Sequence, residues 1–251
     1  MKGEQVHLYV DGTVATLALN NPSKRNAANR AMYVSIPQLV GEATRNPAVR
    51  VLVLRGEGEV FCSGSDISEF SEHRLGDDHH KYDQAEQQAT EALVACPVPV
   101  VAAIRGACIG GGLGLALAAD LRYAAVDALF AVPPGRLGIG YPLDAVTRLV
   151  STVGQASAAE LLLTAGPLNA KEAWRKGLVH EVVGADELDE LVATRCATIS
   201  SLAPMTLRAV RAALHGQPNA AALTDACFYS TDLIEGINAY TESRRPKFRG
   251  Q

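Results

Sequence analysis

A run of three glycines constrains this chain more than any other feature. Gly110, Gly111 and Gly112 stand between the apolar, β-branched segment Val98–Ile104 and the Leu- and Ala-rich segment Leu113–Ala119. The first segment predicts a buried strand and the second predicts a helix. Each glycine inside such an element costs roughly 0.5–1 kcal/mol relative to alanine. The run therefore indicates that another group approaches the backbone closely.

A strand, a glycine turn and a helix start leave several backbone N–H groups without helical partners. These donors lie at the positive end of the helix dipole, where they suit an anion or an oxygen that becomes negative during a reaction. The alternative is a tight turn whose glycines only let the helix pack on a sheet. The residues of this stretch leave both interpretations open.

Several classes of binding function are disfavoured. The stretch lacks the Gly-x-Gly-x-x-Gly fingerprint of dinucleotide-binding turns, and the chain has no Gly-Lys-Ser or Gly-Lys-Thr of a P-loop. The uncharged run around the glycines is shorter than the about 20 residues that a membrane-spanning helix needs. A net charge of −4 argues against nucleic acid and anionic membranes as partners.

The chain of 251 residues, 48% of them hydrophobic, is long enough for one large domain with a sizeable core. Strands alternate with helices over the first two-thirds and helices dominate the last third, which predicts an α/β core followed by a helical region. Five dispersed cysteines without a Cys-x-x-Cys pair indicate reduced thiols. Because the N-terminal residues also lack a signal-peptide pattern, we expect a cytoplasmic protein.

Hydrophobic periodicity and turn residues predict the individual elements. Strands are expected at Val6–Val10, Thr13–Leu19, Val49–Leu54, Leu121–Ala131 and Leu178–Val183, and helices at Ala31–Thr44, Glu86–Ala95, Ala156–Leu163, Ala170–Lys176, Asp186–Ser201, Pro204–Leu214 and Ala220–Tyr240. The polar segment Glu69–Gln84 is expected to be a solvated loop. Its histidines, His73, His79 and His80, lack the accompanying carboxylate or thiol spacing of a metal site.

Five segments, taken in order and spacing, resemble the crotonase (enoyl-CoA hydratase/isomerase) superfamily over nearly the whole chain. They are Phe61–Ile67, Ile109–Asp120, Gly166–Val183, Glu235–Tyr240 and Arg244–Phe248. The resemblance implies a crotonase-like α/β fold, with a ββα spiral core in residues 1–185 and a C-terminal helical oligomerisation region in residues 186–251. It implies a homotrimer or a dimer of trimers that binds an acyl-CoA thioester. No metal and no cofactor beyond the coenzyme A moiety of the substrate is implied.

The resemblance also implies roles for single residues. The backbone N–H groups of Ser65 and Gly111 would hold the thioester oxygen as it becomes an enolate, which fits the donors inferred above for the glycine turn. The basic tail would be supplied to the nucleotide end by this subunit or a neighbouring one. The residues implied near coenzyme A are Lys24, Arg25, Asp66, Ile67, Lys247 and Phe248.

The chain departs from the hydratase pattern at both catalytic glutamates. Their positions are occupied by Gly114 and Pro134, and neither side chain can transfer a proton. Tyr141 fits the loop of a methylmalonyl-CoA decarboxylase of the superfamily, although the histidine of that enzyme is Ser65 here. Asp144 lies slightly after the aspartates of the dehalogenase and naphthoate-synthase branches, and its alternative role is a helix N-cap.

Three functions therefore stay open. The first is an enzyme of the hydratase/isomerase group that stabilises a thioester enolate. The second is a non-catalytic acyl-CoA binding or carrier protein that kept the pocket and lost the chemistry. The third is an acyl-CoA decarboxylase using Tyr141, because loss of carbon dioxide itself generates the enolate. Turnover of acyl-CoA thioesters by the purified protein would separate the enzymes from the carrier.

Overall fold

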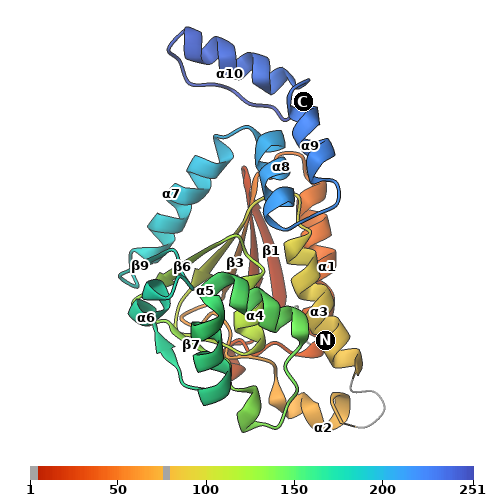
Figure 1. Ribbon diagram of the computed structural model, residues 1–251, viewed down its shortest axis with the longest axis vertical. Coiled ribbons are helices and arrows are strands. Elements are labelled where there is room, and N and C mark those ends of the chain that lie inside the picture. Colours follow the sequence, from red (N-terminus) through yellow and green to blue (C-terminus); the bar gives the residue numbers. More distant parts are fainter. Residues whose placement is uncertain (1–4, 76–79) are drawn as a thin grey trace.

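A six-stranded sheet forms the centre of the computed structural model, which describes residues 5–75 and 80–251 (Figure 1). The strand order is β1-β2-β3-β4-β6-β9. β1 and β2 pair as an antiparallel hairpin that turns at Gly12, and the other neighbours are parallel. The strands are β1 Val6–Asp11, β2 Val14–Leu19, β3 Val51–Gly56, β4 Val100–Ile104, β6 Leu121–Ala125 and β9 Glu181–Val183.

A second, three-stranded sheet has the order β5-β7-β8, formed by β5 Ala107–Ile109, β7 Leu129–Ala131 and β8 Leu168–Asn169. The single strand expected over Leu121–Ala131 is therefore wrong, because β6 and β7 belong to different sheets. A turn separates them, closed by the Ala128 N–H, which donates to the Ala125 carbonyl over 3.0 Å. The chain passes from the large sheet to the small one after β4 and again after β6, which places the glycine turn after β5 beside β7.

Ten α-helices and three short 3₁₀-helices lie in the described ranges. The α-helices are α1 Arg30–Arg45, α2 Phe70–His73, α3 His80–Val94, α4 Gly111–Leu117, α5 Leu143–Thr164, α6 Ala170–Arg175, α7 Leu188–Ser200, α8 Pro204–Leu214, α9 Ala220–Cys227 and α10 Thr231–Thr241; the 3₁₀-helices are η1 Pro22–Lys24, η2 Ile67–Glu69 and η3 Pro134–Arg136. Helices α1 and α3 cover one face of the large sheet, and α7 covers the other (Figure 1).

The loop expected over Glu69–Gln84 is in large part helical, because α2 lies in it and α3 starts at His80. An aromatic contact explains the difference: the rings of Phe70 and Tyr82 meet edge to face at 5.5 Å, and the Arg74 guanidinium lies over both. His79 lies outside the described residues. Among the described residues, no cluster of His, Cys, Asp or Glu could hold a metal ion.

Two further expectations need correction. Helix α5 begins at Leu143 with Pro142 as its N-cap, so Asp144 lies in the first turn and is not the cap. The helix expected over Ala220–Tyr240 is two helices, and the Ser230 side chain caps the second by accepting from the Leu233 N–H over 3.1 Å. The helix expected over Ala170–Lys176 is present as α6, and Asn169 is its N-cap in a capping box with Glu172.

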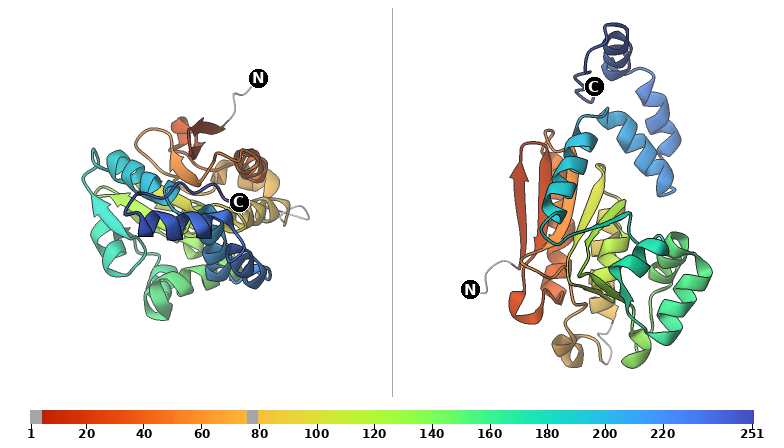
Figure 2. Two further views of the ribbon diagram at one scale, coloured as in Figure 1. Left: turned by 90° about the horizontal axis from the view of Figure 1, so that it is seen from above. Right: turned by 90° about the vertical axis from the view of Figure 1, so that its left-hand side faces the viewer.

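The C-terminal helices extend beyond the end of the sheet, as Figure 1 and the right-hand view in Figure 2 show. Helix α8 is held to the core by Arg211, which donates to the Asp120 carboxylate over 2.7 Å and to main-chain carbonyls at the end of α3. The turn after α9 and helix α10 instead leave large apolar side chains exposed: Phe228, Tyr229, Ile234, Ile237 and Tyr240. No helix in the described part of the chain is both long and apolar enough to cross a membrane.

Candidate active site

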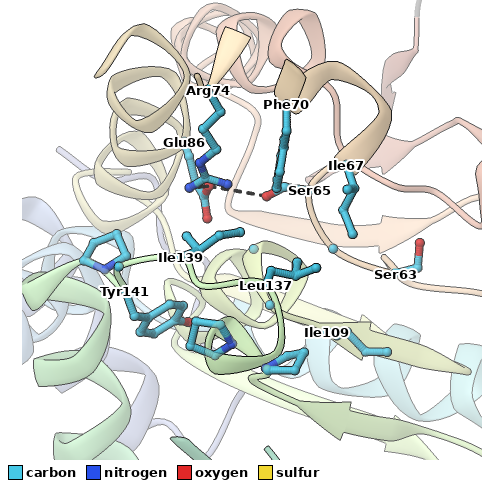
Figure 3. A pocket seen from close by; sticks show the side chains of 17 residues that line it. Ser63, Ser65, Ile67, Phe70, Arg74, Glu86, Ile109, Leu137, Ile139 and Tyr141 are labelled. Atoms are coloured by element: carbon cyan, nitrogen blue, oxygen red, sulfur yellow. Dashed lines mark hydrogen bonds and ion pairs between the residues drawn. The ribbon is translucent and has the colours of Figure 1, made fainter. Parts of the chain in front are cut away.

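A pocket of about 100 Å³ lies where the loop after β3, the start of α4 and the loop before α5 meet (Figure 3). It collects residues from segments that are far apart in the sequence. Its lining consists of Ser63, Gly64, Ser65, Ile67, Phe70, Arg74, Glu86, Ile109, Gly110, Gly111, Pro133, Pro134, Leu137, Ile139, Gly140, Tyr141 and Pro142. The pocket thus contains Ser65, Gly111 and Tyr141 of the predicted site residues.

The bridge between Ser65 and Ala28 does not use the N–H group of Ser65. Ala28 donates to the Gly64 carbonyl and accepts from the Asp66 N–H, both over 2.8 Å, which makes an isolated parallel bridge between Ala28 and Ser65. Because successive groups of extended backbone point to opposite sides, the Ser65 N–H is directed away from Ala28. No hydrogen bond within the described residues uses this N–H.

Gly111 is the first residue of α4, so its N–H has no helical acceptor. The preceding Gly110 has φ +53° and ψ −118°, a conformation that favours glycine, and its N–H donates to the Ala131 carbonyl over 2.9 Å. A Cβ atom on Gly111 would lie 2.7 Å from Ser65 Oγ and 2.9 Å from Glu86 Oε1. Close approach of other groups therefore requires glycine here, as the sequence predicted.

Glu86 is the functional candidate that the sequence interpretation missed. Its carboxylate accepts from the Ser65 hydroxyl over 3.3 Å, and that hydroxyl also contacts the Tyr33 hydroxyl at 3.0 Å. The Glu86 side chain is only 16% exposed, and burial raises the pKa of the carboxyl, an effect opposed by Arg74 at 3.6 Å. A buried carboxyl with a raised pKa beside a pocket is a candidate for proton transfer.

Arg74 occupies the same side of the pocket as Glu86 (Figure 3). Its guanidinium lies 4.7 Å from the ring centre of Phe70 and forms an ion pair with Asp83 at 2.6 Å. These contacts fix the cation against the α2–α3 junction. The carboxylate of Glu86 consequently faces one cation and one hydroxyl donor, Ser65, which together favour its ionised form.

Tyr141 lines two adjoining cavities, whereas Asp144 lines only one of them. Tyr141 lines the pocket on the side opposite Glu86, and burial raises the pKa of its phenol (Figure 3). Asp144 is absent from the lining; it lies 3.6 Å from Arg148, one turn further along α5. It borders an adjoining cavity of about 260 Å³ together with Gly114, Glu86 and Tyr141. A Cβ atom on Gly114 would meet nothing within 4 Å, so the place of the first expected glutamate is open space.

Comparisons with known proteins bear on this pocket. The family described as enoyl-CoA hydratase/isomerase matches residues 10–251. The chain belongs to this family. An enoyl-CoA hydratase/carnithine racemase structure from Magnetospirillum magneticum shares 32% identity over 99% of this chain and 96% of its own, with a TM-score of 0.93. The expected crotonase-like α/β fold with C-terminal helices is confirmed.

Curated relatives carry different activities in their names. A protein named Delta(3,5)-Delta(2,4)-dienoyl-CoA isomerase, peroxisomal, from Arabidopsis thaliana is 34% identical over 98% of this chain and 96% of its own. A probable enoyl-CoA hydratase from Bacillus subtilis is 33% identical over 98% of this chain and 99% of its own. Family membership therefore leaves the reaction type to be argued from the site.

The residues expected near coenzyme A fall into two groups within this family fold. Lys24 donates to the Asp66 carboxylate over 2.6 Å and to the Ser68 hydroxyl over 2.7 Å. Burial alone would raise the pKa of Asp66, but the hydrogen bonds that its carboxylate accepts from Lys24 and from the hydroxyl and N–H of Ser68 lower it. Ile67 lines the pocket and is 56% exposed. Arg25 adjoins this group, because its carbonyl accepts from the Ser63 N–H over 3.1 Å.

The tail forms the second group, at the opposite end of the molecule from the pocket (Figure 1). The Lys247 N–H donates to Glu235 over 2.7 Å, and the Phe248 ring packs on Gly236 in α10. One chain therefore does not bring Lys247 and Phe248 to its own pocket, so any contact they make with this site must come from another copy.

Glu86 carried a signal that periodicity could have revealed. Helix α3 buries Tyr82, Ala85, Ala89 and Leu93 at helical spacing, and Glu86 lies on this apolar face. An acidic residue on a buried helical face requires a partner or a function. The helix predicted from the sequence begins only at Glu86, so it omits Tyr82 and Ala85, which complete this buried face.

Proposed function

We propose that this protein binds an acyl-CoA thioester and stabilises its enolate, with the N–H groups of Ser65 and Gly111 as hydrogen-bond donors to the thioester oxygen. The observation that carries the proposal is that these two donors, from separate segments of the chain, meet at one pocket and have no acceptor among residues 5–75 and 80–251. Membership of the enoyl-CoA hydratase/isomerase family supports the same ligand class.

Fixed N–H donors suit this task because they need no reorganisation when negative charge develops on the oxygen. Removing one such donor from an oxyanion hole costs roughly 3–4 kcal/mol of transition-state stabilisation. The pairing of Ala28 with the Ser65 segment and the start of α4 hold both backbone segments in place. The partly apolar lining, with Phe70, Ile109 and Leu137, would exclude water and strengthen the electrostatic interaction.

Isomerisation is the reaction that we favour for this site. Hydration adds water and needs two positioned proton-transfer groups, whereas Gly114 and Pro134 offer none. Moving a double bond requires only that a proton leaves one carbon and arrives at another. The Arabidopsis relative is named as such an isomerase. Decarboxylation is the second candidate, favoured by Tyr141 in the pocket lining.

We further propose that Lys24, Arg25, Asp66 and Ile67 border the coenzyme A moiety at the pocket mouth, and that the tail residues Lys247 and Phe248 reach it from a neighbouring subunit. The exposed apolar side chains of α9 and α10 support a homotrimer or a dimer of trimers, since contiguous exposed apolar surface marks protein interfaces.

Binding and turnover of a thioester panel test the proposal. The panel contains hexanoyl-CoA, β,γ-unsaturated hexenoyl-CoA, crotonyl-CoA and methylmalonyl-CoA, each measured by calorimetry and by product analysis. We expect the protein to bind the acyl-CoA thioesters and to isomerise the β,γ-unsaturated one. Binding without any turnover would favour the carrier function, and loss of carbon dioxide from methylmalonyl-CoA would favour decarboxylation. Absence of binding to every thioester would refute the proposal.

A further inference from the structure

We propose that Glu86 is the catalytic residue that moves the substrate proton, in place of the two glutamates that the hydratase pattern would supply. The inference rests on the proposed function, since it assigns the base to the same enolate-stabilising pocket. It concerns a residue on α3, outside both segments that the resemblance associates with proton transfer.

The geometry places this carboxyl beside both proposed donors. Its Oε2 accepts from Ser65 Oγ over 3.3 Å, and its Oε1 lies 2.9 Å from where a Cβ atom of Gly111 would stand. Glu86 lines the pocket itself, and its side chain points toward the cavity (Figure 3). A thioester whose oxygen contacts the N–H groups of Ser65 and Gly111 therefore presents its α-carbon in the cavity that Glu86 borders.

The proton step balances without a further reactant. The C–H bond at the α-carbon breaks and an O–H bond forms on the Glu86 carboxylate. The electron pair moves through the carbonyl carbon onto the thioester oxygen, which the N–H groups of Ser65 and Gly111 stabilise. Return of the proton to the α-carbon restores the substrate, whereas delivery to the γ-carbon of a β,γ-unsaturated chain brings the double bond into conjugation.

The surroundings tune Glu86 for this role. Several charged and titratable groups interact with Glu86. Asp83 and Tyr82 lie on its own helix, and the segments packed against that helix supply Arg74, Tyr33, Cys62, Tyr141 and Asp144. Burial raises the pKa of the carboxyl, and Arg74 opposes that rise. A base whose pKa moves toward the working pH accepts a proton more effectively while still being ionised.

The other candidates do not fit the base role. Burial raises the pKa of Tyr141, so its phenol stays protonated at neutral pH and can donate but not accept the α-proton. Asp144 lies outside the pocket that holds Ser65 and Gly111; of these two cavities it lines only the adjoining one, which it shares with Glu86, and it lies 3.6 Å from Arg148. Among the described residues that line this pocket, Glu86 is the one carboxylate.

Exchange of α-protons in deuterium oxide tests the assignment. Hexanoyl-CoA and β,γ-unsaturated hexenoyl-CoA are incubated with the wild type, Glu86→Gln, Glu86→Asp and Glu91→Gln, and deuterium uptake is followed by mass spectrometry. Glu91 is the matched control, because it lies on the same helix, is exposed, and its carboxylate accepts from the Gln87 amide over 2.7 Å. Calorimetry with a non-reactive thioether analogue of acyl-CoA reports binding separately.

We expect Glu86→Gln to lower exchange by ~10²-fold or more while thioether binding stays within a few-fold of the wild type. Glu86→Asp should retain intermediate exchange, and the wild-type rate should rise with pH through one ionisation that Glu86→Gln lacks. Exchange by Glu86→Gln at the wild-type rate would overturn the assignment and leave the proposed function standing. A wild type that binds but never exchanges would overturn both.

Discussion

The hydroxyl of Ser65 donates to the carboxylate of Glu86 over 3.3 Å, so the residue whose N–H is proposed to hold the thioester oxygen also contacts the proposed base. Ser65→Ala separates the two roles, because it keeps the N–H and removes the hydroxyl. The Ser65 hydrogen bond lowers the pKa of Glu86 against the larger raising effect of burial. Its removal should therefore raise that pKa.

For Ser65→Ala we expect the pH midpoint of α-proton exchange to move upward, with a loss of less than ~10-fold in the plateau rate. The measurement is the exchange rate of hexenoyl-CoA over a pH series in both proteins. A midpoint that moves to lower pH, or does not move, would show that the Ser65 hydroxyl does not act on the titrating group.

Crotonyl-CoA hydration should be slow in the wild type, although the thioester binds. Each missing proton-transfer group is worth ~10²–10⁴-fold, and Glu86 alone serves one proton. A carboxylate at position 114 has room, because a Cβ atom there meets nothing within 4 Å and the site borders a cavity of about 260 Å³.

We therefore expect Gly114→Glu combined with Pro134→Glu to accelerate crotonyl-CoA hydration, measured by loss of enoyl absorbance. Gly114→Ala is the control and should leave hydration unchanged while raising stability by about 0.5–1 kcal/mol, as for alanine in place of a helical glycine. Efficient hydration by the wild type, unaffected by Glu86→Gln, would show that another group performs the proton transfer.

The attachment of α8 predicts a pH-dependent stability. Asp120 accepts from the Val100 N–H, from Arg211 and from His215, each over 2.7 Å. Burial alone would raise the pKa of Asp120, but the hydrogen bonds and the charge of Arg211 lower it. A lowered pKa contributes stability that is present above the unfolded value of about 3.9 and is lost as the pH falls through the folded value.

In urea unfolding, Arg211→Met should cost about 3–5 kcal/mol at neutral pH, because it leaves the Asp120 carboxylate buried without its main partner. Because Asp120→Asn lacks the titrating carboxylate, its free energy of unfolding should fall less than that of the wild type as the pH drops below about 4. The control is Arg208→Met on the same helix, which lies outside this network. Equal losses in Arg208→Met and Arg211→Met would contradict the role given to the network.

The C-terminal helices predict an assembly. Ile237 and Tyr240 on α10 are 58% and 88% exposed, and a folded monomer would leave both in water. We expect a trimer or hexamer by analytical ultracentrifugation at micromolar concentration, and a shift to smaller species in Ile237→Glu.

Removal of residues 243–251 should weaken coenzyme A binding and reduce its salt dependence. A monomeric wild type would contradict both expectations.

The glycine turn was predictable because it needs only local chemistry: strand residues, three glycines and helix formers in sequence. The break between β6 and β7 was not, because Leu121–Ala131 is mostly apolar and the change of sheet shows only in the pairing: Val126 still bonds to Val183 of β9, whereas Leu129 pairs with Ala107 of β5. The α2–α3 region was missed because the contact of Phe70, Arg74 and Tyr82 is tertiary and leaves no period in the sequence.

The residues of the candidate site also divide into those that the sequence could predict and those that it could not. Ser65 and Gly111 could be named from motifs, since their proposed roles depend on backbone groups at fixed places in a loop and a helix start. Glu86 could not, because its proximity to them depends on the packing of α3 against α1 and α4. The tail residues Lys247 and Phe248 show the limit of a motif: the match fixes them in the sequence, but their distance from the pocket depends on which subunit supplies them.

The stretching frequency of the bound thioester carbonyl tests the central claim most directly. Infrared difference spectra of isotope-labelled hexanoyl-CoA report whether hydrogen-bond donors polarise the carbonyl, independently of any proton transfer. We predict a lower frequency on binding to the wild type, Glu86→Gln and Gly114→Ala. The shift should be absent in Gly111→Ala, because the added Cβ atom would lie 2.7 Å from Ser65 Oγ and displace the donors. A bound carbonyl with the same frequency as in solution would contradict the account.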